Sequence, residues 1–404
     1  MKFFLFIFFV CFVYQSRACT SAIISGKVTK DGRPLMWKHF DNEQQLNKKV
    51  LYLSGGKYSA MAIVNAGYKE NKTIWMGYNS EGFAIMSTDS GNLRDSVRVE
   101  TNMSGVFMKE ALLNCASVEE FESFLKNYPK PHGFRVNFGV IDARGNGAYF
   151  ETNNFTYVCY DVNDARVAPN GYLIRTNYSL SGLQGKGHGY IRYKTVEKIL
   201  ERYGGKRLDI NFLLNSVCFS LENSLSGQKL QDFENAREHE KHYMYFQDCI
   251  NRYSTSAAAV IQGVKNNEDS GMTTMWTIIG FPLTSVAIPV WLSTSGELPS
   301  IITGNGEKKS MLCNFSLQLK KTLIAATYGD MRYYINTTGL KNIEGTGILQ
   351  RIDPVRKEVF QRGIGLKEKL KNEKGRDGKI KMYYEWLDSY LKRELQGIKE
   401  LYVR

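Results

Sequence analysis

Short runs of β-favouring residues come in three groups along the chain, and stretches with helical periodicity separate these groups. The runs are bounded by turns rich in Gly, Asn and Asp, which is typical of β-strands. The expected strands are 21–25, 35–38, 50–53, 60–65, 73–77 and 83–87, then 136–141, 147–151, 156–160 and 172–176, then 256–263, 272–280 and 285–291. Groups of strands separated by helices predict an α+β chain of two antiparallel sheets with helices outside, rather than alternating βαβ units.

The helical stretches show amphipathic spacing and one clear start signal. Ser117 and Glu120 form a capping-box pattern, because the serine hydroxyl and the glutamate side chain can each satisfy a backbone N–H at a helix start. The expected helices are 105–114, one that begins at Ser117, 190–203, 209–221, and a long polar helical tail after the third group of strands.

No internal repeat, proline-rich linker or low-complexity segment marks a domain boundary. We therefore predict three segments: a signal peptide at 1–18, one large domain at 19–350, and a charged helical C-terminal extension at 351–404. The oligomeric state is left open, a homo-oligomer included.

The first residues have the features of a secretory signal peptide. Lys2 precedes an apolar run from Phe3 to Tyr14, which is too short for the roughly 20 helical residues that span a bilayer. Ser16 and Ala18 occupy the −3 and −1 positions of a cleavage before Cys19. We therefore expect an exported protein, periplasmic or extracellular. A lipoprotein signal also cuts before a cysteine, but Ser16 and Arg17 fit that pattern badly.

The formal net charge is +13, and much of the excess lies in the last fifty residues. A basic tail can contact an anionic membrane or nucleic acid. Acidic residues alternate with the basic ones, for example in Lys367-Glu368-Lys369, which favours a solvated helix face. We therefore predict neither a nucleic-acid partner nor an integral membrane span, and expect a small-molecule substrate.

Cysteines and cofactor motifs narrow the chemistry further. Six cysteines remain after residue 18, without CxxC spacing: Cys19, Cys115, Cys159, Cys218, Cys249 and Cys313. Their spacing indicates neither a metal ribbon nor a disulfide framework, although one bridge in an oxidising compartment stays open. The chain has no Walker-type loop, and we predict no cofactor.

Cleavage before Cys19 would place a thiol and an α-amine on one residue. The model-compound pKa values of these groups are about 8.5 and about 7.7–8.0, so the free amine can take the proton of the thiol without a histidine. The turn 30–34 folds the first two expected strands into a hairpin, which returns through Lys38-His39-Phe40-Asp41. We therefore expect Asp41 beside Cys19, where a carboxylate can hold the amine.

These residues resemble a known family. The motifs are Cys19-Thr20-Ser21, Lys38-His39-Phe40-Asp41, the segment 77–84 (GYNSEGFA), Arg175-Thr176-Asn177 and the segment 275–282 (MWTIIGFP). In this order they are similar to the N-terminal-nucleophile amidohydrolases: choloylglycine hydrolases, penicillin V acylases and isopenicillin-N acyltransferase-like enzymes. The resemblance implies a four-layer αββα fold and cleavage of a linear amide through a thioester, with transfer of the acyl group to an amine as the alternative.

The resemblance also implies roles for individual residues. Cys19 would be the nucleophile, Asp41 would orient its amine, and Asn177 would donate to the oxyanion. Four further residues are expected to contact substrate: Lys38, Asn79, Asp89 and Arg192. Two of these depart from the family pattern. Lys38 replaces an arginine and lacks its forked donor geometry. Asp89 replaces an asparagine, and because an ionised carboxylate only accepts hydrogen bonds it cannot stabilise an oxyanion.

Several alternatives remain beside this hypothesis. Asn177 begins an Asn-x-Ser sequence, so a eukaryotic cell could glycosylate it. The segment 238–242 (EHEKH) lacks the spacing of zinc peptidases and is expected to be a solvated helix. A papain-like Cys/His pair would need His39, His132 or His188. A different class of function is a surface binding protein, anchored by acyl chains on a blocked Cys19.

Overall fold

The computed structural model describes residues 18–43, 46–67, 72–95, 103–203, 208–304, 309–371 and 375–403. The predicted signal peptide, apart from its last residue Ala18, lies outside the described residues, so its cleavage stays a prediction.

A six-stranded sheet contains the first strand of the described chain. Its six strands are antiparallel and run in the order β10-β1-β2-β12-β13-β14. Their bounds are β1 Thr20–Ile24, β2 Leu35–Asp41, β10 Tyr172–Arg175, β12 Thr255–Gln262, β13 Thr274–Ile279 and β14 Ala287–Val290. Strands β1 and β2 come from the first expected group and β12–β14 from the third, so this sheet joins segments far apart in the sequence.

The second sheet is a continuous antiparallel meander in chain order. Its strands are β3 Lys48–Leu53, β4 Ala60–Asn65, β5 Met76–Asn79, β6 Ala84–Asp89, β7 Val136–Ile141, β8 Gly147–Thr152 and β9 Tyr157–Asp161. A small two-stranded sheet pairs β11 Tyr243–Tyr245 with β15 Tyr334–Asn336, and neither strand is among those expected from the sequence.

Helices cover the outer faces of both large sheets. The α-helices are α1 Ser104–Asn114, α2 Val118–Asn127, α3 Tyr190–Arg202, α4 Ile210–Phe212, α5 Ser300–Thr303, α6 Met311–Leu323, α7 Thr337–Leu340, α8 Ile348–Leu370 and α9 Arg376–Tyr402. The short helical turns are η1 Gly26–Val28, the π-helical η2 Leu213–Cys218, η3 Leu230–Phe233, η4 Ser270–Met272, η5 Pro282–Thr284 and η6 Gly329–Tyr333. Ser117 caps α2 as predicted, since its hydroxyl accepts from the Glu120 N–H.

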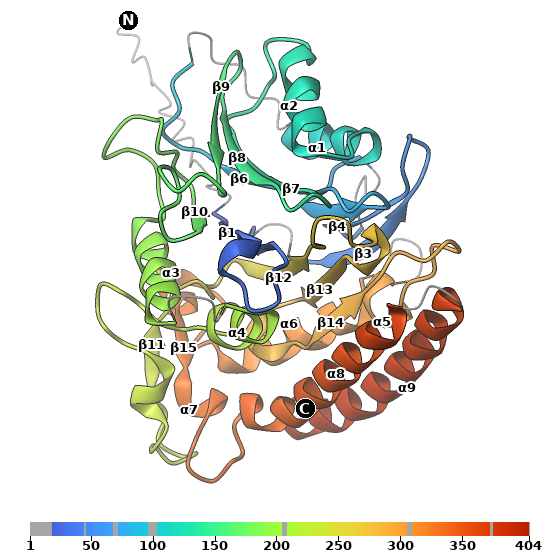
Figure 1. Ribbon diagram of the computed structural model, residues 1–404. Helices are drawn as coiled ribbons and strands as arrows, with labels where there is room; N and C mark the ends of the chain where they lie inside the picture. The colour runs from blue at the N-terminus through green and yellow to red at the C-terminus, as the bar shows by residue number, and fades with distance from the viewer. Residues whose placement is uncertain are drawn as a thin grey trace, which may run out of the picture.

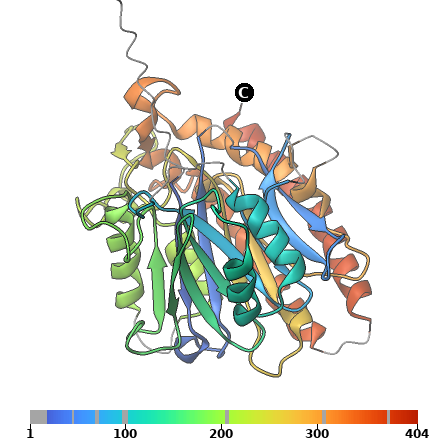
Figure 2. The same ribbon diagram turned by 90° about the horizontal axis from the view of Figure 1, so that it is seen from above.

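Figure 1 shows four layers, with α1 and α2 above one sheet and the long α8 and α9 hairpin below the other. Seen from above in Figure 2, α1 and α2 lie across the meander. Three apolar cores correspond to these contacts: one lies between the sheets and continues around α5–α9, one lies under α3 and α4, and one lies under α1 and α2. The predicted αββα sandwich of two antiparallel sheets is therefore confirmed.

Two local expectations were wrong. The stretch 209–221 is not one regular helix, because Asp209 caps the short α4 and the chain then continues as the π-helical η2. The segment 238–242 is an exposed turn rather than a helix.

The C-terminal segment is packed onto the six-stranded sheet. The predicted boundary at residue 350 falls inside α8, and Ile352, Val359 and Leu391 have no exposed surface. Lys367, expected on a solvated face, is 5% exposed and donates to Gln262 of β12 at 2.6 Å. Among the described residues, no helix combines the length and apolar character of a membrane span.

Candidate active site

The β1–β2 hairpin brings Asp41 to Cys19. Thr20 pairs with His39 in the antiparallel register, so Cys19 lies beside the end of β2. The backbone N–H of Asp41 donates a hydrogen bond to the Cys19 thiol, and this bond acts to lower the thiol pKa. Cys19 is 2% exposed and Asp41 is 0% exposed. The expected proximity of the two residues is therefore confirmed.

Strand alternation divides the side chains of this hairpin between two faces. Members of a cross-strand pair share a face, and so do residues two apart on one strand. Because Ser21 pairs with Lys38, Cys19 shares its face with both. This face lies between the sheets, where the Ser21 and Tyr149 hydroxyls lie 2.8 Å apart. The cysteine thiol therefore belongs to the layer between the two sheets.

Lys38 is a buried cation in that layer. Its Nζ donates to the Trp75 carbonyl at 2.9 Å and lies 4.8 Å and 5.3 Å from the ring centres of Phe40 and Trp75. Aromatic faces stabilise a nearby ammonium through their quadrupoles. The positive charge of Lys38 also acts to lower the pKa of Cys19. Lys38 thus belongs to the cysteine cluster, while its contact with substrate stays a prediction.

Arg192, on the first turn of α3, ties the nucleophile to Asn177. Its Nη1 donates to the Cys19 carbonyl at 2.7 Å and to Thr20 Oγ1 at 2.5 Å, and its Nη2 donates to Asn177 Oδ1 at 2.9 Å. Asn177 Nδ2 in turn donates to the Asp89 carbonyl at 3.1 Å. Arg192 therefore contacts the cysteine backbone and the Asn177 amide, which is a positioning arrangement, while its expected substrate contact stays a prediction.

The Asp41 carboxylate lies among three cationic side chains. Its Oδ1 accepts from the Thr255 hydroxyl at 2.7 Å, and Arg252 Nε lies 3.9 Å from Oδ2. Burial raises the pKa of Asp41, while the charges of Arg252, Arg192 and Lys320 and the Thr255 hydrogen bond act to lower it. Among the described residues, Oδ2 has no hydrogen-bond partner. Burying such an acceptor costs about 1–3 kcal/mol, so this oxygen marks a place for a donor.

The environment of the thiol favours its neutral form. Burial raises the pKa of Cys19 above its ordinary value, the charge of Lys38 opposes this, and the negative charges of Asp41 and Asp89 add to it. A neutral thiol is a weak nucleophile. The arrangement therefore needs a base beside the sulfur before Cys19 can attack a carbonyl.

Asp89 and Asn79 were both expected to contact substrate, and the structure separates them. Asp89 ends β6 and is close enough to Cys19 for its charge to raise the thiol pKa. Asn79 donates to the carbonyls of Leu112 and Cys115, and its Oδ1 accepts from Glu81 and Phe83. Both donors and both acceptor positions of this amide are used within the protein. Asn79 therefore joins the β5–β6 turn to the end of α1, and its expected substrate contact stays a prediction.

The structure also bears on the alternatives. Asn177 is 3% exposed and bonded at both ends of its amide, which opposes glycosylation. His39 faces away from the thiol toward the Cys218 carbonyl, at 3.2 Å, and burial lowers its pKa to about 3. His132 bonds the Asn153 carbonyl. No group of metal-ligating side chains occurs among the described residues.

Sequence reasoning missed three residues around Asp41. Arg252 and Thr255 lie just before and at the start of β12, and Lys320 reaches Asp41 from α6. Thr255 borders a strand that the sequence predicts, so the pairing of β12 with β2 was the missing information. Arg252 and Lys320 carry no recognisable sequence signal, because only the packing of distant segments brings them to the hairpin.

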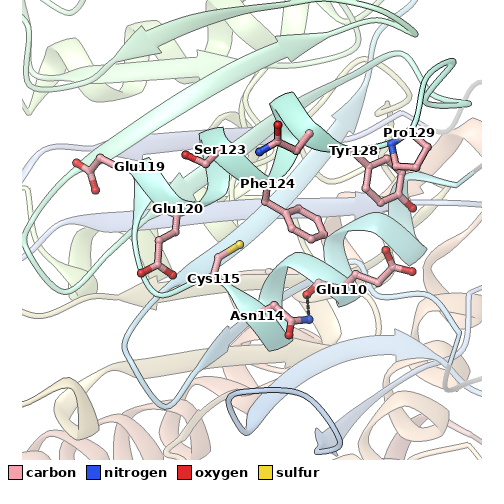
Figure 3. Close-up of a pocket in the computed structure, with 10 residues that line it drawn as sticks. Glu110, Asn114, Cys115, Glu119, Glu120, Ser123, Phe124, Tyr128 and Pro129 are labelled. Carbon is pink, nitrogen blue, oxygen red and sulfur yellow. Dashed lines mark hydrogen bonds between the residues drawn. The ribbon is translucent and has the colours of Figure 1, made fainter.

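A surface pocket of about 640 Å³ lies in a different part of the molecule, between α1 and α2. Figure 3 shows Phe124, Tyr128 and Cys115 within it and the carboxylates of Glu119 and Glu120 near one end. None of its lining residues belongs to the Cys19 cluster. The pocket therefore gives no support to the predicted amide chemistry.

Comparison with known families supports the resemblance drawn from the motifs. Residues 30–207 match the family described as acyl-coenzyme A:6-aminopenicillanic acid acyl-transferase. This range contains Lys38, Asp41, Asn177 and Arg192 but begins after Cys19. A search of curated protein sequences found no match. The match agrees with the predicted resemblance over 178 of the 404 residues.

Three solved structures are reported as similar to this chain. An N-acylethanolamine-hydrolyzing acid amidase ortholog from Caenorhabditis elegans is 14% identical, with a TM-score of 0.41 over 62% of this chain and 95% of that one. A mutant of conjugated bile acid hydrolase from Clostridium perfringens is 14% identical, with a TM-score of 0.40 over 71% and 95%. Penicillin V acylase from Agrobacterium tumefaciens is 12% identical, with a TM-score of 0.40 over 68% and 87%.

Proposed function

We propose, from the match of residues 30–207 to the acyl-coenzyme A:6-aminopenicillanic acid acyl-transferase family, that this protein is an exported enzyme that cleaves a linear amide through a thioester on Cys19. The amide would be a non-peptide or N-acyl amino acid type of substrate. Removal of the residues up to Ala18 would expose the α-amine of Cys19 and so create the catalytic base.

The observation that carries this proposal is a carboxylate oxygen beside Cys19 that accepts no hydrogen bond among the described residues. Asp41 Oδ2 is fully buried, lacks a hydrogen-bond partner among the described residues, and belongs to the residue whose backbone N–H bonds the thiol. An α-ammonium group is a charged donor, and hydrogen bonds to charged groups contribute about 1.5–3 kcal/mol. The exposed amine of Cys19 would fill the missing position on Oδ2 and be oriented by it.

The reaction follows from these positions. The α-amine of Cys19 takes the thiol proton while the sulfur attacks the carbonyl carbon of the amide, forming the C–S bond and a tetrahedral oxyanion. The C–N bond then breaks, and the leaving amine takes the proton from the α-ammonium. Water, deprotonated by the same amine, attacks the thioester, and the C–S bond breaks to release the carboxylic acid and restore the thiol.

The neighbouring side chains would hold these groups in place. Asn177 would donate to the oxyanion, because Arg192 holds its Oδ1 and so fixes which way the amide faces. Lys38 would stabilise the thiolate with its charge, since it already acts to lower the pKa of Cys19. These roles are testable one residue at a time.

An acyltransferase is the second candidate, and the description of the matching family favours it. The chemistry differs only in the last step, where an amine rather than water would attack the thioester. Turnover measured with and without a free amine such as 6-aminopenicillanic acid separates the two. Formation of a new amide at the expense of free acid would identify a transferase.

The first experiment defines the N-terminus of the exported protein. We expect N-terminal sequencing and intact mass to show a free cysteine at position 19. An acylated Cys19 would remove the base and support the lipid-anchored binding protein. A protein that retains Ala18 would contradict the mechanism.

The second experiment tests the nucleophile. Bile-acid conjugates, phenoxyacetyl amides and N-acyl amino acids form a panel of linear amides for the mature protein. Cys19→Ser is expected to keep the fold and lose most turnover, because a hydroxyl is a much poorer nucleophile at neutral pH. Equal turnover by wild type and Cys19→Ser on every cleaved amide would refute the assignment.

A further inference from the structure

Lys320 is a buried lysine that the proposed reaction does not use directly. It extends from α6 and is 3% exposed. Its Nζ donates to the Thr255 carbonyl at 3.1 Å and also to the Tyr253 carbonyl. The rings of Phe281 and Tyr253 lie 4.5 Å and 5.3 Å from Nζ. Burying an ammonium is costly, so these contacts identify a position where its charge or its donors are required.

The backbone that Lys320 contacts is irregular at the active-site end of β12. Asp41 pairs with Thr255 and Phe40 pairs with Ala257, so Ser256 is an extra residue between two cross-strand pairs. Such a β-bulge disrupts the ladder locally and leaves backbone groups without their usual partners. The hydroxyl of Ser256 donates to the Phe40 carbonyl at 3.2 Å, and the ammonium of Lys320 supplies donors to the two carbonyls beside the bulge.

This bulge sets the position of the Thr255 hydroxyl. Thr255 Oγ1 donates to Asp41 Oδ1 at 2.7 Å and accepts from the Arg252 backbone N–H at 3.0 Å. The Lys320 ammonium donates to the backbone carbonyl of the same residue, Thr255. Lys320 is thus connected to Asp41 through Thr255, and through its charge as well, because that charge acts on the Asp41 carboxyl.

We propose that Lys320 is a positioning residue for Asp41, which stabilises the bulge at Ser256, keeps the Thr255 hydroxyl on the carboxylate, and maintains that carboxylate in its charged form. The inference rests on the proposed function, since it assigns Lys320 to the group that holds the α-amine of Cys19. Lys320 touches neither the thiol nor the reacting atoms.

The electrostatic part of the inference has a definite sign. Burial lowers the pKa of Lys320 to about 7, while Asp41 and Glu43 after β2 and Cys313 on α6 act to raise it. Lys320 is therefore charged on the acid side of neutrality. Arg252, before β12, and Arg192, on α3, also face Asp41. Removing one of these positive charges raises the pKa of Asp41, and it raises the pKa of a nearby α-amine in the same way.

Lys320→Met tests this, with Lys320→Arg as the conservative variant and Lys367→Met as a matched control. Lys367 is also a buried helical lysine, it donates to Gln262 at the opposite end of β12, and burial lowers its pKa to about 7 as well. The control therefore reproduces the loss of a buried lysine that bonds the same strand, and Lys367 does not contact Asp41.

We expect the acid limb of kcat/KM in mature Lys320→Met to move to higher pH by up to about one unit, which is up to about a tenfold loss at pH values below about 7, where Lys320 carries its charge. We expect kcat to fall more than KM rises, because the substrate does not contact Lys320. Lys320→Arg is expected to restore the wild-type limb, and Lys367→Met is expected to retain it.

If folded Lys320→Met has the pH profile, kcat and KM of the wild type, the inference is overturned and the proposed function stays intact. An equal shift in Lys367→Met would also overturn the inference, because the effect would then be general loss of packing. If the wild type shows no turnover that depends on Cys19, the proposed function fails instead. Alkylation of Cys19 by iodoacetamide against pH then tests the positioning: its profile should shift upward in Lys320→Met alone, and coinciding profiles refute it.

Discussion

Asp41→Asn is the sharpest single test of the candidate site. The change keeps the shape of the side chain and replaces one carboxylate oxygen by an NH₂ group. Since Thr255 donates to Oδ1 at 2.7 Å, the amide oxygen is expected to stay there and the NH₂ group to take the position of Oδ2. That position faces Arg252 Nε, 3.9 Å away. A donor would then meet donors, and the α-amine of Cys19 would lose its acceptor.

The magnitude follows from the hydrogen bond that is lost. A hydrogen bond to a charged group contributes about 1.5–3 kcal/mol, and each 1.36 kcal/mol corresponds to tenfold in rate. We therefore expect kcat/KM to fall by about 10-fold to about 150-fold. The negative charge of Asp41 stabilises the protonated amine, so its removal lowers the pKa of the amine and moves the acid limb to lower pH. This direction is opposite to that expected for Lys320→Met.

The assay compares kcat/KM against pH for wild type and variant, after N-terminal sequencing has shown that both begin at Cys19. Asp142→Asn is a matched control, because Asp142 is also 0% exposed but accepts from Val118, Arg144 and Asn146 at the β7–β8 turn. It should lose stability and keep the pH profile. A mature Asp41→Asn enzyme with the wild-type rate would return Asp41 to a turn role and refute the reasoning.

Two further predictions concern stability. Glu151→Gln is expected to lower the free energy of unfolding by about 3–5 kcal/mol in urea titrations. The reason is that Glu151 pairs with buried Arg175 at 2.7 Å and also accepts from the N–H groups of Leu180 and Ser181. A loss under about 1 kcal/mol would contradict this. The second stability prediction concerns Lys367, whose pKa is lowered to about 7 in the folded protein, against about 10.4 in the unfolded chain. Above pH 7 the unfolded chain therefore binds more protons than the folded protein. The free energy of unfolding gains up to about 1.4 kcal/mol per pH unit from this lysine as pH rises. Lys367→Met should lose that component between pH 7 and 8, and an unchanged slope would show that the lysine titrates normally.

The β1–β2 hairpin illustrates how far local sequence reaches. The alternation of apolar residues and the turn at 30–34 predict both strands, and the antiparallel register then brings Asp41 to Cys19 without any tertiary information. Asn79 shows the opposite case. Its motif resembles that of the family, yet the carbonyls of Leu112 and Cys115 use both of its donors. The motif therefore identifies the residue but does not identify its contacts.

The sequence alone determined the strands of the two large sheets, the α+β class, and the pairing of a candidate nucleophile with its carboxylate, because periodicity, turns and hairpins are short-range properties. Only the tertiary structure decided which cations surround Asp41. Arg192, Arg252 and Lys320 come from α3, the loop before β12 and α6, and they meet because sheet order and helix packing join segments far apart in the chain. The charge of a buried site depends on those long-range contacts, and so does the chemistry expected of Cys19.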